Sequence, residues 1–123
     1  MKKHTILICD DEAGVRDSLK MILDEDYHLH FVTNGEEALK YLRTNDPDLV
    51  ISDIKMPKMN GLETLKALKA LKPHIRVLII TGYESSDVAA QAIKLGADNY
   101  LAKPFDRQEV RSQIQTLLKF PKA

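Results

Sequence analysis

The chain lacks the features that would cross-link it covalently or hold it in a membrane. Its single cysteine, Cys9, excludes a disulfide within the chain, which favours a reducing compartment. The first apolar run covers only Thr5 to Cys9, too short for the core of a signal peptide and far too short to cross a bilayer. We therefore expect a cytoplasmic protein that does not insert into membranes.

An excess of charge of either sign is also missing. Lys and Arg together number 18, as do Asp and Glu, so the formal net charge is zero. Because broad nucleic-acid binding depends on a basic surface, we expect no direct nucleic-acid binding by this segment. Internal repeats and low-complexity linkers are absent too. The 123 residues, 44% of them hydrophobic, fit one domain spanning residues 1–123 with no effector domain of its own.

Short apolar runs alternate with amphipathic segments along the chain. The expected strands are Thr5–Cys9, His28–Val32, Leu49–Ser52, Arg76–Ile80 and Asn99–Ala102. Apolar residues recur at helical spacing after each of them, as Val15, Leu19 and Ile22 do after the first. Doubly apolar strands that alternate with helices indicate parallel βαβ units with helices on both faces of the sheet. The pattern predicts a (βα)5 flavodoxin-like, doubly wound α/β sandwich with strand order 2-1-3-4-5.

The helix ends carry recognisable signals. Asn34 with Glu37, and Asp106 with Glu109, have the three-residue spacing of a capping box. Gly96 is expected to end the fourth helix in a left-handed conformation. The two capping boxes therefore mark the starts of the second and fifth helices, and Gly96 marks the end of the fourth.

Three acids follow the strands that flank the topological switch point. Asp10 and Asp11 come after the first strand, and Asp53 comes after the third. In this architecture the carboxyl ends of those strands form the favoured ligand site. Two like charges about 4 Å apart cost about 1 kcal/mol in water and several times more near a protein surface. A hard divalent cation offsets this repulsion, so we expect Mg²⁺ here, with Mn²⁺ as a substitute.

Asp53 also has a nucleophilic option. Its carboxylate oxygen can attack phosphorus and form an acyl phosphate. Thr81 and Lys103 end the fourth and fifth strands, so a hydroxyl and a cation face the same edge, where they suit phosphoryl oxygens. Taken singly, Asp53 could cap a turn, Thr81 could bond local backbone and Lys103 could be solvated. Their common position at strand ends favours the phosphoryl site.

The loop after Asp53 ends in Asn60-Gly61, which tolerates positive φ.

Over essentially its full length the chain resembles the receiver domain of bacterial two-component response regulators. The resemblance lies in a set of motifs that follow the strands. They are Asp10-Asp11, Ser52-Asp53-Ile54-Lys55-Met56-Pro57, Met59-Asn60-Gly61, Thr81-Gly82, Gly96-Ala97-Asp98 and Tyr100-Leu101-Ala102-Lys103-Pro104-Phe105.

The resemblance implies a phosphoryl acceptor, not an enzyme that turns over substrates. Asp53 would take the phosphoryl group from a sensor histidine kinase or a phosphotransfer protein. Asp11, Asp53 and the backbone carbonyl of Lys55 would bind Mg²⁺ directly, and Asp10 partly through water. The chain would assist only its own phosphorylation and dephosphorylation.

The resemblance further implies how the phosphate is read. Thr81 and Lys103 would bind the phosphoryl oxygens, Tyr100 would be the aromatic switch residue, and the Lys103–Pro104 bond would be cis. The responsive surface would be the fourth helix, fifth strand and fifth helix, where a homodimer is possible. Lys94, Asp98 and Arg111 are candidate contacts on that surface. Gln113 stands where dimerising members of the family often carry arginine.

Two rival functions fit the same fold class. A haloacid-dehalogenase-like phosphatase needs a second acid two residues after its nucleophile, and Lys55 stands there. A flavodoxin-like binding module needs a phosphate-binding loop after the first strand, where Asp10-Asp11-Glu12 would repel phosphate. The output stays open: the chain is either a stand-alone switch like the chemotaxis regulators or a receiver from a longer protein, such as an enhancer-binding activator.

Overall fold

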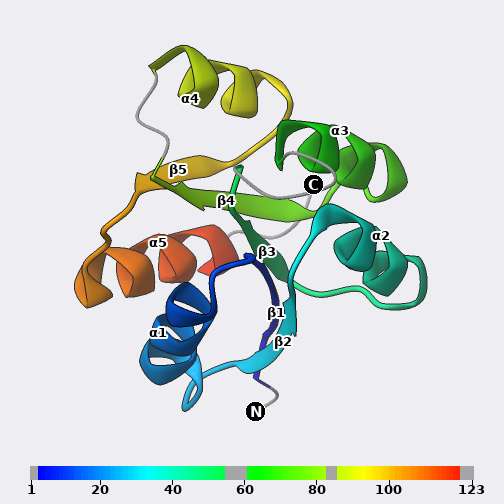
Figure 1. Cartoon of the computed structure of the whole chain (residues 1–123). Helices are drawn as coiled ribbons and strands as arrows, with labels where there is room; N and C mark the ends of the chain where they lie inside the picture. Colours follow the sequence, from blue (N-terminus) through cyan, green and yellow to red (C-terminus); the bar gives the residue numbers. More distant parts are fainter. Residues whose placement is uncertain (1–2, 55–60, 83–85, 120–123) are drawn as a thin grey trace.

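A parallel five-stranded sheet forms the middle of the fold (Figure 1). The computed structural model describes residues 3–54, 61–82 and 86–119. Strand order is β2-β1-β3-β4-β5, with every neighbouring pair parallel, so the predicted 2-1-3-4-5 arrangement is confirmed. The elements are β1 (Thr5–Cys9), α1 (Ala13–Leu23), β2 (His28–Val32), α2 (Gly35–Thr44), β3 (Leu49–Ser52), α3 (Gly61–Leu71), β4 (Arg76–Thr81), α4 (Ser86–Lys94), β5 (Asn99–Ala102) and α5 (Arg107–Lys119).

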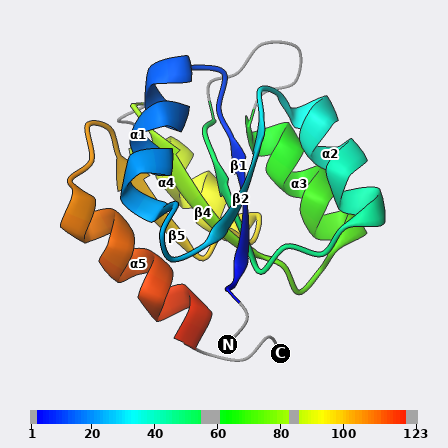
Figure 2. The ribbon, with the colours of Figure 1, turned by 90° about the horizontal axis from the view of Figure 1, so that it is seen from below.

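Helices cover both faces of the sheet, as Figure 2 shows, with α1 and α5 together on one face and α2 and α3 on the other. Alternate residues of each central strand enter the two cores. Leu7 and Val50 pack with residues of α2, α3 and α4, whereas Ile8 and Ile51 pack with residues of α1 and α5. This double burial explains why the central strands are apolar throughout. Within the described residues, no helix has the length and apolar character to span a bilayer.

Side-chain caps fix two helix starts. The Glu37 N–H donates to Asn34 Oδ1 at 2.9 Å, which confirms the predicted cap of α2. In a capping box, Glu37 would accept from the N–H of the cap residue, Asn34. Here Glu37 Oε1 accepts instead from the N–H and the hydroxyl of Thr33, one residue earlier. The reciprocal box is present at α5, where Asp106 and Glu109 each accept from the other's N–H at 3.4 Å.

The two glycines singled out from the sequence act differently. Gly96 has φ +111° and ends α4, with the Ala97 N–H donating to the Ala92 carbonyl, as predicted. Gly61 is required for close approach. A Cβ there would lie 2.3 Å from the Asp53 carbonyl oxygen, so any other residue would displace the backbone of Asp53. Asn60 lies outside the described residues.

Candidate functional site

Two buried carboxylates lie side by side at the carboxyl edge of the sheet. Asp10 directly follows β1 and Asp53 directly follows β3, and each is only 3% exposed. The Asp53 N–H donates to the Cys9 carbonyl at 3.1 Å, and the Asp10 N–H donates to the Val32 carbonyl at 3.1 Å. Both acids therefore stand on backbone that continues the sheet's hydrogen bonding, which holds them rigidly.

Lys103 brings three carboxylates together. Its Nζ lies 2.8 Å from Asp53 Oδ2, 3.0 Å from Asp10 Oδ2 and 3.0 Å from Glu12 Oε1. An ammonium group has three N–H donors, so each contact can use one. Lys103 follows β5 and is 14% exposed in its side chain. The residues that the sequence placed at separate strand ends thus meet in one ion-pair cluster.

The charge states follow from burial and these bonds. Burial raises the pKa of the Asp10 carboxyl, although bonds from the Glu12 N–H and Lys103 oppose the change. Burial alone would lower the pKa of Lys103, but its bonds to Asp53, Glu12 and Asp10 together raise it above its ordinary value. Lys103 is therefore a fixed cation at neutral pH.

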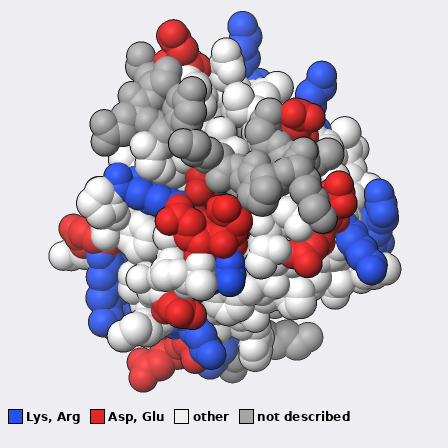
Figure 3. All heavy atoms as spheres, viewed as in Figure 1, with Lys and Arg blue, Asp and Glu red and all other residues white. Residues whose placement is uncertain are grey.

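The donor set at this edge suits a hard cation. Asp10, Asp11, Glu12 and Asp53 each offer one carboxylate oxygen, and these four oxygens lie within 4.8 Å of one another. Carboxylate oxygens are the ligands that Mg²⁺ prefers, so the residues present fit this ion. Figure 3 shows the acidic side chains gathered near the centre of one face of the molecule. The backbone carbonyl of Lys55, a predicted ligand, lies outside the described residues.

Two contacts of this cluster are absent from the sequence-based prediction. Glu12 reaches Lys103, and the Arg16 guanidinium donates to the Asp10 backbone carbonyl at 2.8 Å. Glu12 adjoins the Asp10-Asp11 pair, so its position in the sequence was the available signal. Arg16 lies on α1 at helical spacing from Glu12, which puts it over the same edge.

Thr81 and Tyr100 lie on the neighbouring strands. Thr81 is the last residue of β4, is fully buried, and its carbonyl accepts from the Lys103 N–H at 2.9 Å. Tyr100 pairs with Ile79 across β4 and β5 and packs, partly buried, against the core under α2, α3 and α4. The Lys103–Pro104 peptide bond is cis, as the resemblance implies.

Two of the candidate contacts on the α4–β5–α5 surface have partners within the chain. Asp98 Oδ2 accepts from the Val77 N–H at 2.8 Å at the start of β4. Arg111 bonds to the Ile22 carbonyl at 3.1 Å and to Asp26 at 2.9 Å, which ties α5 to the end of α1. These side chains therefore also stabilise the fold.

Comparisons with known proteins agree with this geometry. The model of the response regulator receiver domain family matches residues 6–115. The chain is 39% identical over 119 residues to sporulation initiation phosphotransferase F of Bacillus subtilis, with 96% of each chain covered. It is 38% identical over 114 residues to the transcriptional regulatory protein ZraR of Escherichia coli, covering 92% of this chain but 26% of that protein.

Solved structures point the same way. A CheY-like response regulator receiver domain protein from Methanospirillum hungatei superposes with a TM-score of 0.92 at 31% identity, covering 96% of this chain and 95% of that one. These comparisons support neither the phosphatase nor the flavodoxin-like binding module. The chain belongs to the receiver domain family of two-component response regulators.

Proposed function

We propose that residues 1–123 form a single receiver domain that accepts a phosphoryl group on Asp53. The donor is a sensor histidine kinase or a phosphotransfer protein, the partners with which receiver domains of this family interact. The observation that carries the proposal is the 2.8 Å bond between Lys103 Nζ and Oδ2 of the buried Asp53, where the buried Asp10 carboxylate shares the same cation. Phosphorylation with acetyl phosphate and Mg²⁺, followed by intact-mass measurement, tests it: one phosphoryl group per chain is expected.

The chain's own groups account for the transfer. Asp53 Oδ1 accepts from the Ile54 N–H at 2.7 Å, and Oδ2 accepts from Lys103, so the carboxylate is held in one orientation. An Asp53 oxygen forms a bond to phosphorus as the donor's bond to phosphorus breaks, and the leaving atom keeps the electron pair. Lys103 and the Thr81 hydroxyl then bind phosphoryl oxygens, on which negative charge accumulates.

Receiver domains generally bind Mg²⁺ at an acidic pocket. In this chain Asp11, Asp53 and the Lys55 backbone carbonyl would hold the ion, and Asp10 would act partly through water, with Mn²⁺ as a substitute. When bound, the cation offsets the charge of the carboxylates and of the phosphoryl oxygens. We propose that the chain assists only its own phosphorylation and dephosphorylation and does not turn over other substrates.

Mg²⁺ is expected to raise the thermal stability of the protein. An ion that binds only the folded state stabilises it by RT ln(1 + [L]/Kd), about 2.7 kcal/mol at a hundredfold excess over Kd. Asp11→Asn should reduce this response, whereas Asp17→Asn, on an exposed residue of α1, should not. Melting temperatures across a millimolar Mg²⁺ titration measure the effect. A wild-type melting temperature that ignores Mg²⁺ would refute the metal site.

Phosphorylation is expected to change the α4–β5–α5 surface through Thr81 and Tyr100. A phosphoryl oxygen draws the Thr81 hydroxyl toward it, and the Tyr100 ring turns into the space beside β4. A full shift from 1:99 to 99:1 needs about 5.5 kcal/mol, so a smaller differential affinity gives partial activation. Amide exchange with and without beryllofluoride, an acyl-phosphate mimic, measures the shift.

Protection should change in α4 and β5 of the wild type and much less in Thr81→Ala. If exchange changes only near Asp53, the switch does not run through Tyr100.

A homodimer through this surface is part of the same proposal. Gln113 accepts a hydrogen bond from Asn99 of β5 within the chain. Sedimentation of the beryllofluoride-bound protein decides between monomer and dimer.

A further inference from the structure

The Asp11 carboxylate differs from the other acids of the cluster. Lys103 bonds to the carboxylates of the other three. Asp11 is exposed, and among the described residues no donor bonds to its side chain. The proposed function nevertheless makes Asp11 a direct Mg²⁺ ligand, so the direction of its side chain must be set by its backbone.

The two peptide groups that flank Asp11 are both held by hydrogen bonds. On its C-terminal side, the Glu12 N–H donates to Asp10 Oδ1 at 2.9 Å. On its N-terminal side, the Asp10 carbonyl accepts from Arg16 Nη1 at 2.8 Å. Because peptide groups are planar, fixing the two planes on either side of a residue fixes its φ and ψ. These bonds therefore set the direction in which the Asp11 side chain leaves the backbone.

The Arg16 side chain reaches back over this loop. Its own N–H donates to the Glu12 carbonyl at 3.1 Å, in the first turn of α1. Long side chains on a helix point toward the helix N-terminus, which here is the end next to Asp10. Arg16 is half-buried, and a hydrogen bond from a charged donor is stronger than one between neutral groups. The guanidinium group therefore clamps the loop between β1 and α1.

Asp10 does not depend on this clamp. Its N–H continues the hydrogen bonding of the sheet, and its carboxylate bonds to Lys103 and to the Glu12 N–H. Loss of the Arg16 bond would leave these contacts in place. Asp11 has no such side-chain contacts among the described residues, so the loss of order would fall on Asp11.

Given the Mg²⁺ site proposed above, on which this role rests, the geometry points to Arg16 as a positioning residue. It directs the Asp11 carboxylate toward the ion through the Asp10 carbonyl and does not itself touch the ion or the phosphoryl group. The charge of Arg16 acts against a second cation. Loss of the charge alone would therefore tighten Mg²⁺ binding, whereas loss of the positioning contact weakens it.

Arg16→Met removes the guanidinium group and keeps a long apolar stem. We expect its Kd for Mg²⁺ to rise about tenfold, as is typical when a contact that orients a metal ligand is lost. Urea unfolding at a series of Mg²⁺ concentrations measures this, because the added stability follows RT ln(1 + [Mg²⁺]/Kd). A purely structural role would lower the free energy of unfolding in Mg²⁺-free buffer and leave Kd unchanged. Unchanged or tighter binding would overturn the proposal.

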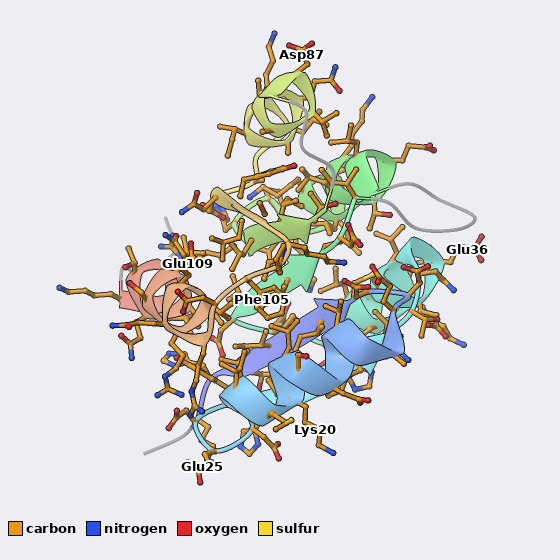
Figure 4. All side chains as sticks on the ribbon, turned by 60° about the vertical axis from the view of Figure 1, so that its left-hand side comes forward. Lys20, Glu25, Glu36, Asp87, Phe105 and Glu109 are labelled. Atoms are coloured by element: carbon orange, nitrogen blue, oxygen red, sulfur yellow. The ribbon has the colours of Figure 1, made fainter. Side chains whose placement is uncertain are left out.

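Lys20→Met is the matched control. Lys20 lies about one turn further along α1, exposed at the outside of the molecule (Figure 4). The substitution removes the same charge without touching the loop, so Kd should stay within about twofold of the wild type. A rise equal to that in Arg16→Met would make the effect a property of α1 as a whole and would contradict the assignment.

A second background tests whether Arg16 acts through Asp11. In Asp11→Ala, titrated to higher Mg²⁺ concentrations, Arg16→Met should change Kd less than about twofold, because no carboxylate remains to be positioned. The full loss of affinity in that background would mean that Arg16 acts elsewhere in the site, and the assignment would be wrong.

Phosphorylation kinetics give an independent measurement. With acetyl phosphate, Arg16→Met should need about ten times more Mg²⁺ to reach half its maximal rate, yet its maximal rate should lie within about twofold of the wild type. A maximal rate that stays low would mean that Arg16 contacts the phosphoryl group or its donor, contrary to the proposal. If Mg²⁺ affinity depends on Arg16 as described but the wild type takes no phosphate, the proposed function has failed and the positioning role stands.

Discussion

Asp53→Asn should abolish covalent phosphorylation while the fold persists. The amide has nearly the shape of the carboxylate, and its oxygen can still accept the 2.7 Å bond from the Ile54 N–H. It has no nucleophilic carboxylate oxygen, so no acyl phosphate can form. Intact-mass spectra after incubation with acetyl phosphate and Mg²⁺ should show one phosphoryl group on the wild type and none on the variant.

A matched control guards this result against a general effect of removing acid. Asp17→Asn makes the same change on the exposed side of α1 and should accept phosphate like the wild type. Circular dichroism should give all three proteins the same helix content. Undiminished labelling of Asp53→Asn would place the acceptor elsewhere.

Lys103→Met should damage both transfer and stability. Removing one preorganised charge from the phosphoryl site is expected to slow phosphorylation about 10²- to 10³-fold. The buried carboxylates of Asp10 and Asp53 would also lose the Lys103 ammonium group that they share, and in Mg²⁺-free buffer no other cation replaces it. Breaking a buried pair in this way costs about 3–5 kcal/mol. Denaturant unfolding and acetyl phosphate kinetics measure the two effects separately.

Lys103→Arg separates charge from geometry. Its guanidinium keeps the positive charge, so much of the stability should return, but a planar fork cannot reproduce three bonds from one nitrogen, so transfer stays slow. Added Mg²⁺ should restore part of the stability of Lys103→Met because it supplies the missing charge. A Lys103→Met protein as stable as the wild type without Mg²⁺ would contradict the ion-pair cluster described above.

The fold was predictable because its signals are local. Strands buried on both faces are apolar runs such as Leu49–Ser52, and the helix starts carry caps such as Asn34. The meeting of Asp10, Asp53 and Lys103 followed from topology, since residues at the carboxyl ends of neighbouring parallel strands must share one edge.

The remaining contacts depend on how distant segments approach one another. Glu12 reaches Lys103, 91 residues away, only because the β5–α5 loop passes beside the start of α1. Arg111 turns toward Asp26 because α5 packs beside α1. The closeness of Gly61 to the Asp53 carbonyl is likewise a packing distance that spacing along the sequence does not encode.

The central claim, that Asp53 is the phosphoryl acceptor, is tested most directly by chemical trapping. Borohydride reduces an acyl phosphate to the alcohol, so a phosphorylated aspartate becomes homoserine at its own position in the chain. Peptide mass spectrometry of the protein reduced after incubation with acetyl phosphate and Mg²⁺ should find homoserine at position 53. Homoserine at position 10 or 11, or none in a protein that has gained phosphate, would contradict the account.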